Sequence, residues 1–255
     1  MSRFASYPSL RDRVVFVSGG GSGIGASIVE HFAEQGAKVG FVDIDEAASK
    51  ALGAKIAAAG HPQPLFAKSD VRDIAAYQAV IADMASRLGP ITVLVNNAAR
   101  DDRHSIEEVT PAFWDERISV NLRHQYFAIQ VVAPGMKTAG GGSIVNFSSV
   151  SYHAMTPRLS VYQAAKAAVI GMTRGLARDL GPDKIRLNSI TPGWIMTQRQ
   201  IDLWLTPEAE ADLMKAQCLK EKLYPPDIAR MALWLAADDS RLVTAQNFVV
   251  DGGRV

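Results

Sequence analysis

The stretch Arg13-Val-Val-Phe-Val-Ser18, continued by Gly19-Gly20-Gly21-Ser22-Gly23-Ile24-Gly25, decides the fold. Its apolar first part is typical of a short buried strand. In residues 24–35 apolar side chains recur at helical spacing, and Gly36 ends the pattern. Glycines let a ligand approach the backbone closely, and a helix N-terminus offers free N–H groups to an anion. A glycine-rich run alone could be an ordinary turn, but one between a strand and a helix predicts a pyrophosphate site.

Short apolar runs and amphipathic stretches alternate along the rest of the chain. Further strands are predicted at residues 38–43, 65–68, 91–96, 143–147, 185–190 and 247–250. Helices are predicted at residues 47–59, 74–88, 111–136 and 160–180. Since helical connections between parallel strands form right-handed crossovers, we expect an α/β fold. It would be a doubly wound (Rossmann) parallel sheet with helices on both faces.

No linker rich in proline or glycine divides the chain, so we expect a single domain over residues 1–255. Residues 195–223 interrupt the alternation of strands and helices. We expect this segment to form a helical flap over a substrate.

Composition excludes several classes of protein. Hydrophobic residues make up 48% of the chain and the net charge is +1, unlike a disordered protein or a strongly basic nucleic-acid binder. Cys218 is the only cysteine, so no internal disulfide can form. Residues 1–10 lack the apolar core of a secretory signal, and no run approaches the roughly 18 apolar residues of a membrane span. We expect a cytoplasmic protein that binds neither nucleic acid nor a membrane.

Asp43 ends the second predicted strand and bears on the choice of dinucleotide. A carboxylate there can accept hydrogen bonds from both hydroxyls of an adenosine ribose, and it would repel a 2′-phosphate. The position therefore favours NAD over NADP. Asp45 is close enough to compete for this role, and either residue could instead be a solvated aspartate.

Ser149, Tyr162 and Lys166 form the candidate catalytic group. Tyr162 and Lys166 are four positions apart on a predicted helix and share one face. A tyrosine has a pKa of about 10, which a nearby ammonium lowers. Tyr162 could then act as a general base, while Ser149, after the fifth predicted strand, holds the substrate oxygen. Pairs of this spacing are also common on surface helices, so the pair alone is weak evidence.

Together these motifs resemble the short-chain dehydrogenase/reductase family over about residues 10–253. The matching segments are Ser18–Gly25, Asn96-Asn-Ala-Ala99, Asn121, Ser149, Tyr162-x-x-x-Lys166, Pro192-Gly193 and Asp251-Gly-Gly253. Two positions depart from the family pattern. Ser18 replaces the commoner threonine and keeps its hydroxyl, and Ala99 replaces a glycine, which puts close backbone packing there in doubt.

The resemblance implies a role for each matching residue. Tyr162 would be the acid/base, Lys166 would lower its pKa and hold the nicotinamide ribose, and Ser149 would orient the substrate. Asn121 would anchor a water that relays protons through Lys166. The implied NAD-binding residues are Gly19, Ser22, Gly23, Ile24, Gly25, Asp43, Asp70, Val71, Asn97, Tyr162, Lys166, Pro192, Gly193, Ile195 and Thr197. Asp70 would contact adenine, Asn97 the adenosine ribose and Thr197 the carboxamide.

A narrower resemblance, to the bacterial aldose 1-dehydrogenases, comes from segments outside this shared core. They include Asp101-Asp-Arg-His104, Trp114-Asp-Glu-Arg117, Val132-Ala-Pro-Gly-Met136 and Thr197-Gln-Arg-Gln200. The implied reaction oxidises the anomeric hydroxyl of a cyclic sugar to an aldonolactone. Relatives are usually tetramers, so the resemblance also implies a homotetramer paired through residues 111–136 and 160–180.

Polar side chains near the expected ligand edge are candidates for binding the sugar. They are Ser149, His153, Tyr162, Trp194, Gln198 and Arg199. The alternatives are a satisfied structural histidine at His153, a packing role for Trp194, and a solvated loop at residues 101–104. His104 and His124 lack close metal-ligand spacing, so no metal is predicted.

Two other functions remain open. One is an oxidoreductase acting on another alcohol or ketone, such as an alditol, a steroid or a 3-oxoacyl substrate. The other is a catalytically inactive NAD-binding regulator, which the intact Asn121, Ser149, Tyr162 and Lys166 argue against. The narrower resemblance favours the sugar.

Overall fold

Seven parallel strands form one sheet in the computed structural model, which describes residues 4–255. The order β3-β2-β1-β4-β5-β6-β7 reverses direction between β1 and β4. In open α/β sheets, ligands bind at the carboxyl ends of the strands beside such a switch point. The strands are β1 (Val14–Ser18), β2 (Lys38–Asp43), β3 (Leu65–Lys68), β4 (Val93–Asn96), β5 (Gly142–Phe147), β6 (Ile185–Pro192) and β7 (Asn247–Val250).

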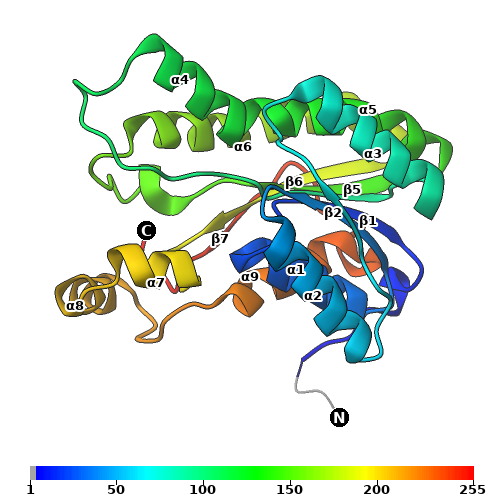
Figure 1. Ribbon diagram of the computed structural model, residues 1–255, viewed down its shortest axis with the longest axis horizontal. Coiled ribbons are helices and arrows are strands. Elements are labelled where there is room, and N and C mark those ends of the chain that lie inside the picture. Colours follow the sequence, from blue (N-terminus) through cyan, green and yellow to red (C-terminus); the bar gives the residue numbers. More distant parts are fainter. Residues whose placement is uncertain (1–3) are drawn as a thin grey trace.

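Helices cover both faces of the sheet (Figure 1). On one face lie α1 (Gly23–Glu34), α2 (Glu46–Ala58) and α9 (Pro225–Ala236), which enclose the core that contains Ile28, Phe32 and Leu233. The other face carries α3 (Ile74–Leu88), α4 (Pro111–Ile118), α5 (His124–Thr138) and α6 (Ser160–Leu180). Buried apolar side chains fill this second core, among them Tyr77, Ile81, Met84 and Ile129. The predicted doubly wound architecture is confirmed.

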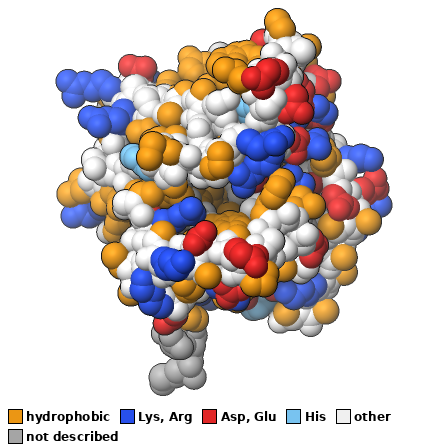
Figure 2. All heavy atoms as spheres, turned by 90° about the vertical axis from the view of Figure 1, so that its left-hand side faces the viewer, with side chains coloured by type: hydrophobic (Ala, Val, Ile, Leu, Met, Phe, Trp, Pro, Cys, Tyr) orange, Lys and Arg blue, Asp and Glu red, His pale blue; other side chains and the backbone are white. Residues whose placement is uncertain are grey.

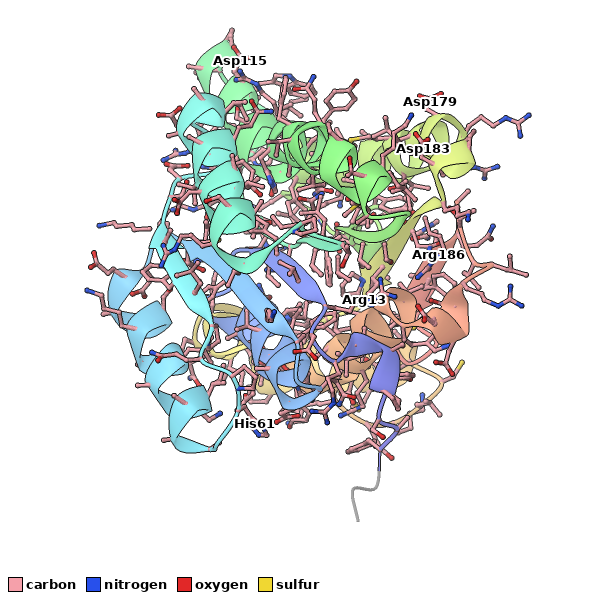
Figure 3. All side chains as sticks on the ribbon, turned by 90° about the vertical axis from the view of Figure 1, so that its right-hand side faces the viewer. Arg13, His61, Asp115, Asp179, Asp183 and Arg186 are labelled. Carbon is pink, nitrogen blue, oxygen red and sulfur yellow. The ribbon has the colours of Figure 1, made fainter. Side chains whose placement is uncertain are left out.

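Helix α9 is absent from the sequence prediction, although its start signals are present. Pro225 and Pro226 occupy the first helical positions, and Asp227 Oδ2 accepts a hydrogen bond from the backbone N–H of Tyr224 at 2.8 Å. Both features are typical of a helix N-terminus. At the opposite end, Arg186 Nη2 donates to Leu235 O at 2.8 Å, and Arg13 pairs with Asp238 (Figure 3).

The long helical region predicted over residues 111–136 is helical throughout, but its middle has a different winding. A five-residue π-helical turn, Ser119–Arg123, separates α4 from α5. The carboxamide of Asn121 lies inside this turn and bonds both backbone groups of Arg100 and the carbonyl of Arg117. Such local widening of a helix is often found at functional sites, and a hydrophobic pattern does not reveal it.

Residues 195–223, called the flap below, contain α7 (Gln198–Trp204) and α8 (Pro207–Ala216). Thr197 and Thr206 cap these two helices with their hydroxyl groups. The ends of the flap meet, because Ile195 and Leu223 form an isolated parallel bridge. In Figure 1 the flap lies beyond the ends of β6 and β7.

No helix within residues 4–255 is both long and apolar enough to cross a membrane. The prediction that residues 1–10 are not a secretory signal falls partly on residues 1–3, which lie outside the described residues.

Candidate active site

A cavity of about 1240 Å³ opens at the carboxyl ends of the strands, under the flap. Figure 2 shows the molecular face that carries this hollow, with charged side chains gathered around it. The glycine-rich loop, the ends of β2, β4, β5 and β6, one face of α6 and the flap all contribute to its wall. The cavity therefore lies at the switch point of the sheet.

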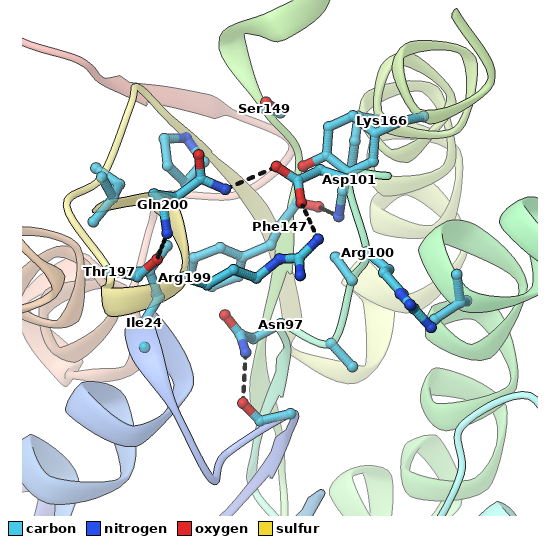
Figure 4. A pocket seen from close by; sticks show the side chains of 18 of the residues that line it. Ile24, Asn97, Arg100, Asp101, Phe147, Ser149, Lys166, Thr197, Arg199 and Gln200 are labelled. Atoms are coloured by element: carbon cyan, nitrogen blue, oxygen red, sulfur yellow. Dashed lines mark hydrogen bonds and ion pairs between the residues drawn. The ribbon is translucent and has the colours of Figure 1, made fainter. Parts of the chain in front are cut away.

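The glycine-rich loop is folded so tightly that side chains are excluded. A Cβ atom on Gly25 would lie 1.8 Å from the carbonyl oxygen of Gly19, and Gly19 itself has φ +68°. Asn97 holds the loop from β4, since its Nδ2 donates to Gly19 O at 2.9 Å (Figure 4). Ser22 makes no capping bond through its side chain, so the first N–H groups of α1 face no internal acceptor there. This cradle fits a pyrophosphate.

The hydroxyl of Ser18, at the end of β1, joins this strand to the chain that follows β4. Its Oγ accepts hydrogen bonds from the backbone N–H groups of Asn97 at 3.1 Å and Ala98 at 3.2 Å. A serine performs this bracing as a threonine would. The substitution of the commoner threonine leaves the junction of β1 and β4 intact.

The carboxylates predicted at the adenosine end also line the cavity. Asp43 Oδ2 accepts a hydrogen bond from Gly21 N at 2.8 Å, and Oδ1 accepts one from Asp45 N at 3.0 Å. The side chain of Asp45 instead caps α2, which assigns the two aspartates different roles. Asp70 pairs with Arg72, whose hydrogen bonds lower the pKa of the Asp70 carboxyl.

Ser149, Tyr162 and Lys166 meet in this cavity. Ser149 follows β5, and its Oγ accepts from Ser151 N at 3.2 Å. Tyr162 and Lys166 lie one turn apart on α6, with the ammonium 5.6 Å from the centre of the phenol ring. Lys166 is buried, and its Nζ donates to Phe147 O at 2.8 Å. The structure thus brings together three of the four predicted catalytic residues at the cavity wall.

The fourth, Asn121, is buried behind the wall and does not line the cavity. Its Oδ1 accepts from Arg100 N at 2.8 Å and its Nδ2 donates to Arg100 O at 3.0 Å. These bonds fix the loop that follows β4.

The electrostatics of Tyr162 differ from the prediction. Burial, together with the negative charge of Asp101, raises the pKa of Tyr162 above its ordinary value, and a hydrogen bond with Ser149 opposes the shift. Burial also lowers the pKa of Lys166 to about 7. Burial of both groups thus opposes the lowering of the Tyr162 pKa that is expected from Lys166.

A chain of hydrogen bonds ties the flap to the loop after β4 (Figure 4). Trp194 Nε1 donates to Gln200 Oε1 at 2.9 Å, and Gln200 Nε2 donates to Asp101 Oδ2 at 2.8 Å. Arg199 Nη2 lies 3.4 Å from Asp101 Oδ1 and 3.1 Å from Asp102 Oδ1. Gln200 was not among the predicted site residues, although it belongs to the motif that carried the narrower resemblance.

Of the other predicted substrate residues, three line the cavity and one does not. Trp194, Gln198 and Arg199 line the cavity, although the Gln198 amide is bonded to Asp202 on its own helix at 2.7 Å. His153 does not line it; this exposed residue stacks on Tyr152 with ring centres 4.0 Å apart.

The remaining predicted cofactor residues all line the cavity. They are Ser22, Gly23, Ile24, Val71, Pro192, Gly193, Ile195 and Thr197. Within residues 4–255, no three His, Cys, Asp or Glu side chains gather to hold a metal ion.

Known proteins that resemble this chain in sequence include named dehydrogenases. A family model described as enoyl-(acyl carrier protein) reductase matches residues 19–254. A protein of Rhizobium meliloti (strain 1021) named "Probable galactose dehydrogenase GalD" is 51% identical over 249 residues, covering 98% of this chain and 97% of that one. D-xylose 1-dehydrogenase of Caulobacter vibrioides (strain NA1000 / CB15N) is 48% identical, covering 98% of both chains.

Solved structures share the fold. A 7α-hydroxysteroid dehydrogenase complexed with NADH and 7-oxoglycochenodeoxycholic acid superposes with a TM-score of 0.91 at 30% identity, over 96% of each chain. A blue fluorescent protein from a metagenomic library, in complex with NADPH, gives 0.88 at 34% identity, over 97% of this chain and 99% of that one. Nicotinamide dinucleotides of both kinds are thus bound on this scaffold.

Proposed function

The chain belongs to the short-chain dehydrogenase/reductase family, and from that premise we propose that it is an NAD-dependent aldose 1-dehydrogenase. It would oxidise the anomeric hydroxyl of a cyclic aldose of the L-arabinose, D-galactose or D-xylose type to the aldonolactone. One observation carries the proposal: Ser149, Tyr162 and Lys166 meet in a single cavity, in a chain about half identical to two named sugar dehydrogenases.

The chain's own residues would supply orientation and proton transfer. Ser149 and Tyr162 would hold the anomeric oxygen, and Tyr162 Oη would take its proton as the C1–H bond breaks. A nicotinamide ring, when bound, supplies the acceptor for the hydride. Because positive charge lowers the pKa of a nearby phenol, a cationic ring beside Tyr162 would oppose the effects of burial and of Asp101. Lys166, whose Nζ donates to Phe147 O, would hold the nicotinamide ribose. It would also exchange protons with a water that Asn121 anchors.

Asp43 supports NAD rather than NADP. Its carboxylate is fixed by the N–H groups of Gly21 and Asp45 at the end of β2, within the cavity wall. A ribose hydroxyl could donate to it, whereas a 2′-phosphate would meet a negative charge. The glycine cradle and the Asp70–Val71 wall would complete the dinucleotide site.

We also propose that the protein is a cytoplasmic homotetramer. Aromatic side chains of Trp114 on α4 and Tyr126 on α5 are 45% exposed, which fits a helical face covered by a second subunit. Size-exclusion chromatography with light scattering would test the assembly, and a stable monomer would contradict it.

The deciding experiment is formation of NADH at pH 8 with a panel of substrates. D-xylose, L-arabinose, D-galactose, L-fucose and D-glucose would be compared with alditols and a secondary alcohol, each with NAD and NADP. Turnover of one or two aldoses with NAD is expected. Activity on an alditol or secondary alcohol alone would replace the sugar by another alcohol substrate. Dinucleotide binding without turnover of any substrate would favour an inactive regulator.

A further inference from the structure

Two buried N–H groups on the flap side of the cavity lack partners. Arg103 Nε and Trp204 Nε1 meet no hydrogen-bond acceptor among residues 4–255. Both residues line the cavity, Arg103 from the loop after β4 and Trp204 from the last position of α7. A buried donor without a partner is destabilising, so such groups call for an explanation.

The two side chains are held against each other. The guanidinium carbon of Arg103 lies 4.7 Å from the ring centre of Trp204. Arg103 Nη1 donates to Pro157 O at 3.2 Å, which fixes the guanidinium from the side of α6. No carboxylate within residues 4–255 forms an ion pair with Arg103. The stacked pair therefore presents two N–H groups that are free to bind a ligand.

An acceptor lies two positions earlier in the same loop. The Asp101 side chain, 21% exposed, accepts from Gln200 Nε2 at 2.8 Å and pairs with Arg199 at 3.4 Å. A carboxylate has about four acceptor sites, so two contacts leave Asp101 able to take another donor. Figure 4 shows Asp101 facing the flap within the pocket.

This combination of donors and acceptor selects for hydroxyl groups. A hydroxyl both donates and accepts, so the hydroxyl groups of a sugar can satisfy the Asp101 carboxylate and the two free N–H groups alike. A carboxylate or phosphate would satisfy the donors but would approach the charge of Asp101, which already acts on Arg103. An apolar group would leave every donor unsatisfied. The Trp204 ring, which lines the cavity, also adds apolar surface of the kind that packs on the C–H side of a sugar ring.

We propose that Asp101, Arg103 and Trp204 form a hydroxyl subsite for the part of the sugar remote from the reacting carbon. This inference rests on the proposed function, which places the reacting carbon beside Ser149 and Tyr162. It adds Trp204 to the aromatic contact expected from Trp194, whose N–H is already bonded to Gln200 and is not free for a sugar hydroxyl.

Steady-state kinetics of Trp204→Phe and Arg103→Leu test the subsite. Both variants should raise KM for the aldose that the wild type oxidises best by about three- to tenfold, the worth of one hydrogen bond. Their kcat should change less than twofold. Trp234→Phe is the matched control, since Trp234 lies outside both the cavity wall and the proposed subunit face. Fluorescence titration with NADH should give unchanged affinity in all three variants.

Monodeoxy sugars identify the bound hydroxyl and separate contact from folding. One analogue lacking a hydroxyl remote from C1 should show the same KM in wild type and Trp204→Phe. This comparison stands even if Arg103→Leu fails to fold. Two results would overturn the subsite but not the proposed function. One is an active enzyme in which Trp204→Phe leaves KM unchanged. The other is that Trp204→Phe raises KM by the same factor for every monodeoxy sugar. A wild type that oxidises no aldose would overturn the proposed function as well as the subsite.

Discussion

Gln200 Nε2 of the flap lies 2.8 Å from Asp101 Oδ2 of the loop after β4. This hydrogen bond joins two parts of the cavity wall that are 99 positions apart in the chain. Asp101 also acts electrostatically on Tyr162 and Lys166. The position of the flap and the charge environment of the catalytic group are therefore linked through one carboxylate.

Removing this contact should loosen the flap. In Gln200→Leu, KM for the aldose should rise about three- to tenfold, because one partly buried charge-assisted bond is lost. Hydrogen exchange of residues 198–204 should become faster. Gln63→Leu, an exposed position outside the cavity, serves as the control. Unchanged exchange in Gln200→Leu would show that other contacts hold the flap.

Tyr162→Phe should abolish turnover while sparing the dinucleotide site. We expect kcat to fall by about 10³-fold or more, given the usual contribution of acid–base catalysis. Binding of NADH should stay within twofold of the wild type. The exposed Tyr224, which lies outside the cavity wall, provides the matched control, Tyr224→Phe. Turnover near the wild-type level in Tyr162→Phe would remove the phenol from the mechanism.

Asp43→Ala should narrow the preference for NAD over NADP by about tenfold, since it removes both the ribose acceptor and the charge that repels a phosphate. The ratio of kcat/KM for the two dinucleotides is the measurement. Asp45→Ala should weaken the N-terminus of α2 but leave this ratio unchanged, because Asp45 caps that helix. If Asp45→Ala alone changed the ratio, selectivity would reside at Asp45.

His124 should make the fold sensitive to acid. Burial lowers the pKa of His124 to about 3, and its Nε2 donates to Ala98 O at 3.0 Å. Between about pH 3 and 6.5, His124 is protonated in the unfolded chain but neutral in the native state. The free energy of unfolding should therefore fall as pH decreases, by about 2 kcal/mol from this group between pH 6.5 and 5.

Urea denaturation of the wild type and His124→Gln across this range would isolate the effect. The difference in stability between the two proteins should shrink as the pH falls. The exposed control His153→Gln should follow the wild type. A constant difference would mean that His124 titrates normally.

The sequence predicts the sheet and most of its helices because strand and helix periodicities are local. It also predicts the glycine cradle, Asp43 and the Ser149–Tyr162–Lys166 group, since each belongs to a motif of fixed spacing. Helix α9 was not predicted, although Pro225, Pro226 and Asp227 are typical of a helix N-terminus.

Other features depend on contacts that no local pattern contains. The π-helical turn follows from bonds between Asn121 and the backbone of Arg100. The pairing of Asp101 with Gln200, and the stack of Arg103 on Trp204, join segments brought together only by the fold. His153 was misplaced because adjacency to Ser149 in the chain does not fix where a side chain points.

The bridge between Ile195 and Leu223 joins the two ends of the flap. Met196 N donates to Leu223 O at 2.8 Å, so both ends of the segment leave the sheet at one place. A segment with joined ends can be lengthened, shortened or exchanged at little entropic cost to the rest of the chain. Substrate choice could thus change by exchange of the part of the flap after Thr197, and protein engineers could transfer that part between relatives while Ile195 and Thr197 stay in the dinucleotide site.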